Sequence, residues 1–142
     1  MDAIVDRQML SASIDVQMIE VGGQQLQVAI KRGPKGRPPL LVFNGIGANW
    51  ELAKPFLTAL KQTDAIIFDV PGVGGSPLPS LPYRPSTLAR LAMSLVEKLG
   101  HEQVDVAGVS WGGVLAQQFA VIEKCPGERA VLLFALADRA RI

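Results

Sequence analysis

The chain has 142 residues and a formal charge of +1, because 14 lysines and arginines nearly balance 13 aspartates and glutamates. That balance argues against a nucleic-acid surface or a polybasic membrane surface, since both need an excess of cations. Hydrophobic residues make up 49% of the sequence and charged residues 19%, which is enough apolar material for a core. We expect a single domain over residues 1–142, with a flexible amino terminus over residues 1–14.

Cysteine and histidine are scarce. The single cysteine, Cys125, cannot form an internal bridge, so a reducing compartment is expected. The single histidine, His101, and the lack of clustered acidic or thiol ligands argue against a zinc site, and no cofactor is expected. The amino terminus lacks a signal-peptide pattern, and the longest uncharged run, residues 106–122, contains polar residues. These features predict a cytoplasmic protein with no transmembrane segment.

Along the chain, the first pattern is an antiparallel hairpin. Residues 16–21 and 24–31 alternate, or nearly alternate, in polarity around Gly22-Gly23, which favours a two-residue turn. Short apolar runs follow, and such runs are typical of strands buried on both faces of a parallel sheet. They lie at residues 40–43, 65–68, 104–109 and 130–136.

Three helices are predicted between these strands. The clearest covers residues 88–99, with Ser86 as its N-cap and Gly100 as its stop. A shorter helix begins at Pro55, where proline suits the first turn. Residues 112–123 are apolar almost all round, which predicts a buried central helix. The order is β-β-β-α-β-α-β-α-β, an antiparallel hairpin leading into a parallel α/β sheet with crossover helices.

One motif carries chemistry. Gly-Val-Ser-Trp-Gly-Gly at residues 108–113 follows a predicted strand and opens a predicted helix. This is the G-x-S-x-G pattern of a nucleophile elbow, in which a serine sits on a sharp, strained turn. Gly108 and Gly112 would let the strand and the helix approach closely. Ser110 is therefore the candidate nucleophile, with its hydroxyl at the carboxyl edge of the sheet.

A second segment fits the same chemistry. Acyl transfer needs amide donors for the developing oxyanion, usually the amide after the nucleophile and one from the loop after the third strand. Trp111 would supply the first amide. The glycine-containing loop at residues 44–49 would supply the second, from Ile46. An ordinary glycine turn into a helix is the alternative interpretation of this loop.

Three segments resemble the α/β-hydrolase superfamily, both in their residues and in their spacing along the chain. They are the elbow at residues 108–113, Phe-Asn-Gly-Ile-Gly-Ala-Asn-Trp-Glu at 43–51, and Phe-Asp-Val-Pro-Gly-Val-Gly-Gly-Ser-Pro at 68–77. Within the superfamily they are most similar to the intracellular medium-chain-length polyhydroxyalkanoate depolymerases. Hydrolases commonly have His-Gly where this chain has Asn44-Gly45, a departure that fits the depolymerase branch. The resemblance runs from about residue 36 to residue 133.

The resemblance implies hydrolysis of an ester bond in a poly(3-hydroxyalkanoate), through an acyl-enzyme on Ser110. It implies no metal and no organic cofactor, and it suggests the surface of a polyhydroxyalkanoate granule as a partner. It also implies an α/β-hydrolase domain that is truncated after the strand following the elbow. We therefore expect the amino-terminal portion of such a domain.

A serine nucleophile needs a base that is itself oriented by an acid, and the family's order is serine, acid, histidine. No histidine follows Ser110. His101 precedes the strand by which Ser110 is reached, and nine residues at about 3.3 Å each place it about 30 Å away. Asp138 is a candidate acid, whereas Asp69 is interpreted as a turn residue. Asp105 is interpreted as structural or as exposed at the start of the strand.

Two functions outside serine hydrolysis stay open. Without its histidine, the chain could be a catalytically incomplete fragment or a non-catalytic domain that binds acyl groups or granules. Alternatively, Gly45-x-Gly47 followed by Asp69 partly matches a dinucleotide-binding fingerprint, although Trp50 replaces the third glycine.

The remaining features have simpler interpretations. Cys125 is expected to be an inert thiol. Trp50 and Trp111 would either line an acyl pocket or provide aromatic packing beside the elbow. The predicted strand at residues 130–136 would be an apolar sheet edge guarded only by Arg139 and Arg141, which predicts oligomerisation or poor solubility through that strand.

Overall fold

The computed structural model describes residues 14–33, 38–79, 81–122 and 131–134. The expected flexible terminus over residues 1–14 falls outside these ranges except for Ile14, which begins the first strand. Cys125, Asp138, Arg139 and Arg141 also lie outside the described residues.

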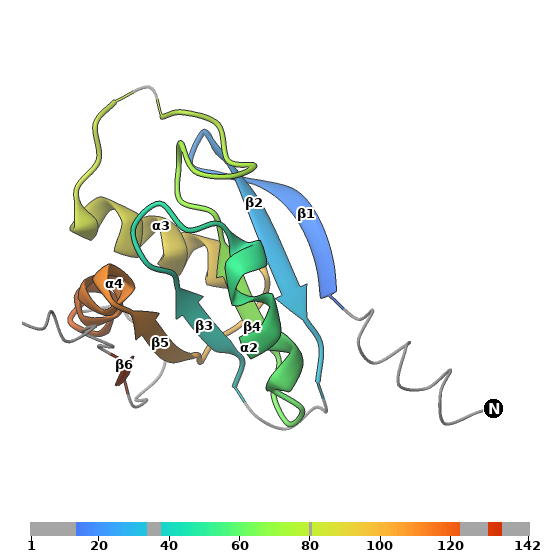
Figure 1. Cartoon of the computed structure of the whole chain (residues 1–142). Helices are drawn as coiled ribbons and strands as arrows, with labels where there is room; N and C mark the ends of the chain where they lie inside the picture. The colour runs from blue at the N-terminus through green and yellow to red at the C-terminus, as the bar shows by residue number, and fades with distance from the viewer. Residues whose placement is uncertain (1–13, 34–37, 80, 123–130, 135–142) are drawn as a thin grey trace, which may run out of the picture.

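The described strands form one mixed sheet in the order β1-β2-β4-β3-β5-β6. Strand β1 pairs antiparallel with β2, and β2 pairs antiparallel with β4. The pairs β3–β4, β3–β5 and β5–β6 are parallel, so the predicted α/β class is confirmed (Figure 1). The strands are β1 (Ile14–Val21), β2 (Gln24–Lys31), β3 (Leu40–Phe43), β4 (Ala65–Phe68), β5 (Asp105–Val109) and β6 (Val131–Phe134).

The hairpin turn is the predicted one. Val21 pairs with Gln24, which leaves Gly22 and Gly23 as the two turn residues. Their φ angles of 57° and 83° are those of a turn that suits the twist of a hairpin and that side chains other than glycine rarely adopt. The predicted two-residue turn is therefore confirmed.

Helices cover both faces of the sheet, which explains why the central strands are apolar throughout. Helices α3 (Pro85–Lys98) and α4 (Trp111–Ala120) pack on the face that carries Phe43 and Phe68. The short 3-10 helix η1 (Trp50–Ala53) and helix α2 (Lys54–Ala59) cover the other face. Figure 1 shows α2 apart from the α3–α4 pair. Alternate residues of each inner strand thus enter two different cores.

The start of α3 corrects one prediction. The helix begins at Pro85 and its N-cap is Arg84, so Ser86 is not the cap. Proline has a fixed φ and no N–H, which suits the first helical position and moves the start one residue earlier than the serine suggested. The Arg84 N–H donates to Thr87 Oγ1 at 3.4 Å.

The end of α3 is as predicted. Gly100 has a φ of 86° and its N–H donates to the Glu97 carbonyl at 2.9 Å, while the His101 N–H donates to the Val96 carbonyl at 3.0 Å. This pair of hydrogen bonds is the usual glycine-terminated helix end. It fixes His101 in the loop between α3 and β5.

Helix α4 differs from the prediction of burial on all sides. It ends at Ala120, and Val114 is 44% exposed while Val121, just beyond the helix, is 75% exposed. The residues that face the sheet, Leu115 and Phe119, are fully buried. The apolar composition of the segment thus overstated its burial, because none of the described elements covers its outer side.

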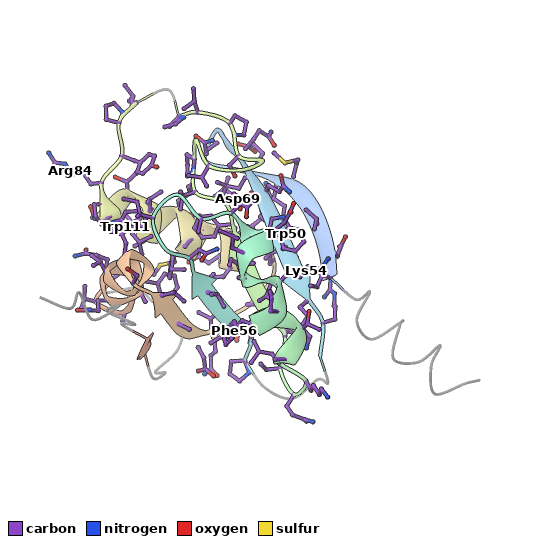
Figure 2. The ribbon with its side chains drawn as sticks, viewed as in Figure 1. Trp50, Lys54, Phe56, Asp69, Arg84 and Trp111 are labelled. Carbon is purple, nitrogen blue, oxygen red and sulfur yellow. The ribbon has the colours of Figure 1, made fainter. Side chains whose placement is uncertain are left out.

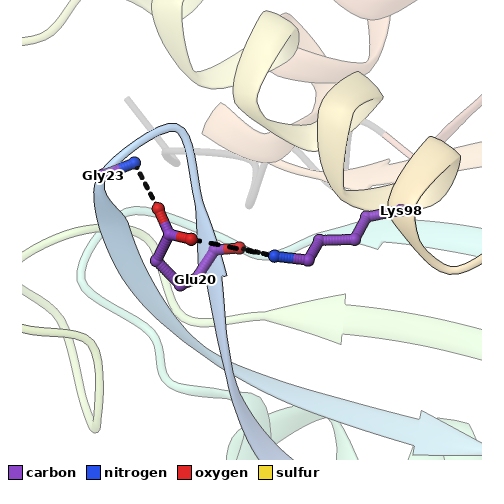
Figure 3. Close-up of polar contacts among 3 residues, drawn as sticks. All are labelled: Glu20, Gly23 and Lys98. Atoms are coloured by element: carbon purple, nitrogen blue, oxygen red, sulfur yellow. Dashed lines mark hydrogen bonds and ion pairs between the residues drawn. The ribbon is translucent and has the colours of Figure 1, made fainter.

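A polar contact joins α3 to the hairpin (Figure 3). Lys98 Nζ donates to the Glu20 carbonyl and lies 3.8 Å from the Glu20 carboxylate, which also accepts the Gly23 N–H at 2.6 Å. Both charged side chains are about half exposed. Such an exposed pair contributes at most about 1 kcal/mol, so packing rather than charge holds the helix to the sheet.

Candidate active site

Ser110 occupies the sharp turn between β5 and α4. Its backbone angles are φ 55° and ψ −119°, and among the described residues it is the one non-glycine with a positive φ. A conformation of this kind costs roughly 1–3 kcal/mol and is found where the surroundings impose it. The Ser110 residue is also exposed, so the strain presents its hydroxyl to solvent.

The two glycines around Ser110 are required by backbone packing. A Cβ on Gly108 would lie 2.3 Å from the Gly112 carbonyl oxygen, and one on Gly112 would lie 2.1 Å from the Phe43 carbonyl oxygen. Real Cβ atoms do not approach so closely. The strand–turn–helix context that the sequence motif needs is therefore present, with glycine where two backbones meet.

The loop at residues 44–49 lies beside this turn. Phe43 is in register with Gly108, so the residues after β3 follow the same edge as Ser110. The Ala48 N–H donates to the Gly45 carbonyl at 3.1 Å, and Gly47 has a φ of 69°. These features are typical of a type II turn with Ile46 at its first central position. Ile46 is 78% exposed.

The amides of Ile46 and Trp111 are available. Within residues 14–33, 38–79, 81–122 and 131–134, no hydrogen bond engages the backbone N–H of either residue. Trp111 is the first residue of α4, where the N–H has no partner within the helix. Helix N-termini also favour negative charge.

Asp69 follows β4 at the same edge and is 1% exposed. Its carboxylate accepts the Trp50 N–H at 2.7 Å and the Gly75 N–H at 2.9 Å. Figure 2 shows Asp69 next to Trp50, with Trp111 apart from both. The interpretation of Asp69 as a turn residue is wrong: its N–H continues the pairing of β4 with β2, and the turn begins at Pro71. Its burial was not predicted either. With both oxygens engaged, this carboxylate is not free to bind a ribose, which speaks against dinucleotide binding.

The other candidate residues are dispersed. His101 and Asp105 precede or begin β5, at the sheet edge opposite Ser110, as the sequence predicted. Trp50 is 9% exposed and packs in the core beneath α2, while the half-buried Trp111 packs against the core on the other face of the sheet. The two indoles therefore do not line one pocket. The Trp50 Nε1 atom is buried without a partner among the described residues.

The residues that the structure describes offer neither a metal-binding cluster nor a membrane-spanning helix. Those residues contain no group of three or more side chains that could hold a metal ion. Nor does any helix among them have the length and apolar character that crossing a membrane requires. A groove of about 590 Å³ between α3 and α4 is lined by residues such as Met93 and Val121, and none of its lining residues belongs to the Ser110 turn.

Comparison with known proteins agrees with this geometry. Residues 38–129 match the model of the alpha/beta hydrolase fold family. The chain is 52% identical over 103 residues to a poly(3-hydroxyalkanoate) depolymerase of Ectopseudomonas oleovorans, covering 72% of this chain and 36% of that protein. It is 31% identical over 96 residues to a soluble epoxide hydrolase of Corynebacterium sp. (strain C12), covering 67% of this chain and 34% of that protein.

The fold comparison gives the same result. The structure of an alpha/beta hydrolase from Novosphingobium aromaticivorans matches with a TM-score of 0.76 and 22% identity, covering 85% of this chain and 44% of that one. The chain thus spans about a third of the length of the curated relatives it matches. The family match over residues 38–129, together with the sheet order and the turn at Ser110, shows that this chain belongs to the alpha/beta hydrolase fold family.

Proposed function

We propose that the protein carrying this chain is a carboxylic-ester hydrolase in which Ser110 is the nucleophile. The observation that carries the proposal is the strained, exposed conformation of Ser110, with φ 55°, between two glycines that cannot bear a side chain. Such strain has no evident benefit to stability and is common where a reactive side chain is presented. The 52% identity to a poly(3-hydroxyalkanoate) depolymerase supports the same reaction class.

The proposed mechanism is acyl transfer through a covalent intermediate. The Ser110 hydroxyl oxygen attacks the ester carbonyl carbon, and the resulting oxyanion accepts hydrogen bonds from the amides of Ile46 and Trp111. Collapse of this intermediate expels the alcohol and leaves an ester on Ser110. Water then attacks this acyl-enzyme, releases the acid and regenerates the serine hydroxyl.

Proton transfer requires a base that the described residues do not place near Ser110. His101 lies at the opposite edge of the sheet, and the carboxylate of Asp69 is committed to backbone amides. The proposal therefore needs a histidine and an acid from polypeptide other than these residues. It does not depend on a metal or an organic cofactor.

The proposed substrate is a polyester of 3-hydroxyalkanoates, acted on at a granule in the cytoplasm. This choice rests on the depolymerase relative, which is more similar in sequence than the epoxide hydrolase of Corynebacterium. A domain that binds acyl chains or granules without turnover is the competing function. The two differ in whether ester bonds are broken at Ser110.

Hydrolysis of p-nitrophenyl octanoate tests the proposal. The protein carrying this chain should release p-nitrophenol, and Ser110→Ala should reduce kcat by about 10³-fold or more. Ser94→Ala is the matched control, because Ser94 is an exposed serine on α3, and this variant should retain the wild-type rate. Equal rates for Ser110→Ala and wild type would refute the assignment, and the absence of hydrolysis by wild type would favour the non-catalytic domain.

A further inference from the structure

One peptide group links the loop at residues 44–49 to the buried carboxylate of Asp69. The carbonyl of Asn49 accepts a hydrogen bond from Asn44 Nδ2 at 2.7 Å. The N–H on the other side of the same peptide, that of Trp50, donates to Asp69 Oδ1 at 2.7 Å. The peptide between Asn49 and Trp50 is thus held from both sides, which fixes where the loop ends.

Asn44 also fixes where the loop begins. Its Oδ1 accepts the N–H of Gly45 at 3.0 Å, while its Nδ2 reaches across the loop to Asn49. The half-buried side chain of Asn44 therefore spans the loop and leaves Ile46 and Gly47 at its tip. The position of the Ile46 amide follows from these two supports.

Asp69 is itself held by strand β2 and by the following loop. Its N–H donates to the Gln27 carbonyl at 2.9 Å. Ser76 Oγ donates to the Asp69 carbonyl at 2.5 Å and accepts the Gln27 N–H at 2.9 Å. Ser76 is 3% exposed, so this arrangement is buried.

The space around the Asp69 carboxylate is full. A Cβ on Gly74 would lie 2.3 Å from Asp69 Oδ2, and the neighbouring Gly75 N–H donates to that same oxygen at 2.9 Å. The backbone of Gly74 and Gly75 therefore lies directly against the carboxylate on its Oδ2 side. Asp69 is 1% exposed. One of its carboxylate oxygens accepts the N–H of Trp50, and the other accepts the N–H of Gly75.

We propose that Asp69 is a positioning residue: through the Asn49–Trp50 peptide and Asn44 it sets the position of the Ile46 amide beside Ser110. The role of that amide rests on the proposed function, whereas the control of the loop by Asp69 does not. Asp69 touches no substrate in this account. It acts on catalysis only through the backbone of the loop that it holds.

Asp69→Asn is an informative substitution because it keeps the shape of the side chain. An amide offers one oxygen where the carboxylate offers two, so either the Trp50 N–H or the Gly75 N–H must face an NH₂ group. Asn44→Ala loosens the same loop from the other side and is a second variant should Asp69→Asn fold poorly. Asp64→Asn is the matched control, because Asp64 accepts the Gly33 N–H at the opposite end of β4.

Amide hydrogen exchange gives a readout that does not depend on catalysis. The hydrogen-bonded amides of this loop, those of Gly45, Ala48 and Trp50, should exchange about tenfold faster or more in Asp69→Asn and in Asn44→Ala, since each variant loses a hydrogen bond that holds the loop. In Asp64→Asn their exchange should match wild type. Unchanged exchange of these amides in both loop variants would overturn the proposal, whether or not Ser110 is the nucleophile.

Ester hydrolysis gives the second readout. In each loop variant kcat should fall about tenfold with little change in KM, because a displaced oxyanion donor weakens the transition state more than the bound ester. The double variant Asn44→Ala/Asp69→Asn should lose no more than the more impaired single variant, since both act through one peptide. Multiplied losses, or a rise in KM alone, would contradict the positioning role. If Ser110→Ala is fully active, the proposed function fails and the exchange result alone decides about the loop.

Discussion

Strand β4 is flanked by an aspartate on each side, and the two carboxylates differ in their burial and in their hydrogen-bond partners. Asp64, just before the strand, is half-buried and accepts the Gly33 N–H at one edge of the sheet. Asp69, just after the strand, is 1% exposed and accepts two amides at the edge that carries Ser110. Both carboxylates attach a loop to the sheet, but only the second is enclosed.

The difference shows where this fold is rigid. At the Asp64 edge the carboxylate is only half-buried, so water can replace a lost partner, although a Cβ on Gly33 would still lie 2.8 Å from the Thr63 carbonyl. At the Asp69 edge, a Cβ on Gly74, Gly108 or Gly112 would lie within 2.3 Å of an oxygen atom. A strained serine persists only when its surroundings determine its conformation, and these contacts supply that constraint.

The largest expected effect concerns glycines in two different turns, the one at Ser110 and the hairpin turn between β1 and β2. Gly112→Ala should lower the free energy of unfolding by about 3 kcal/mol, because its Cβ would meet the Phe43 carbonyl at 2.1 Å. Gly23→Ala, in the hairpin turn, has no atom within 4 Å of its Cβ and should cost about 1 kcal/mol for its positive φ. Urea unfolding measures both. Equal costs would mean that the Ser110 turn is not tightly packed.

The second prediction compares the two aspartates directly. Asp69→Asn should lower the free energy of unfolding by about 2 kcal/mol, because it leaves a buried amide without an acceptor. Asp64→Asn should cost about 1 kcal/mol or less, because its surroundings are only half-buried. The same urea experiment tests this. A larger cost for Asp64→Asn would reverse the comparison on which this account rests.

The smallest effect is a pH dependence at the Asp64 edge. Burial lowers the pKa of Lys31 below its ordinary value of 10.5, and the nearby Asp64 only partly opposes this. Between the lowered pKa and 10.5 the unfolded chain binds the proton more tightly, so this lysine makes stability rise with pH in that window. Urea unfolding of wild type and Lys31→Met at neutral pH and at about pH 10 measures this contribution to the free energy of unfolding. The wild type should gain stability relative to Lys31→Met on raising the pH; a relative loss would contradict the burial of the charge.

Much of the fold was predictable because its signals are local. The strands at 40–43 and 65–68 match β3 and β4 residue for residue, since runs buried on both faces must be apolar throughout. Gly22-Gly23 and Gly100 correctly predicted a turn and a helix end, because glycine readily adopts the positive φ that these positions have. The N-cap of α3 was misplaced because the first-turn preference of Pro85 outweighs the capping preference of Ser86.

The site was predictable only in part. The sequence located the turn at Ser110 and the loop at residues 44–49, since both follow strands with glycine at fixed spacing. It did not predict that Asp69 joins Trp50 to Gly75, because those contacts depend on how β4 is placed between β2 and β3. Contacts between segments far apart in sequence follow from sheet order, which no local pattern encodes.

Covalent labelling of Ser110 tests the central claim most directly. The tryptic peptide covering residues 99–124 contains Ser110 as its only serine and has no threonine or tyrosine. After treatment of the protein carrying this chain with an alkyl fluorophosphonate, mass spectrometry should find the phosphonyl group on that peptide, and Ser110→Ala should abolish the modification. An unmodified peptide in a preparation that hydrolyses p-nitrophenyl octanoate, or a modification that persists in Ser110→Ala, would contradict the account.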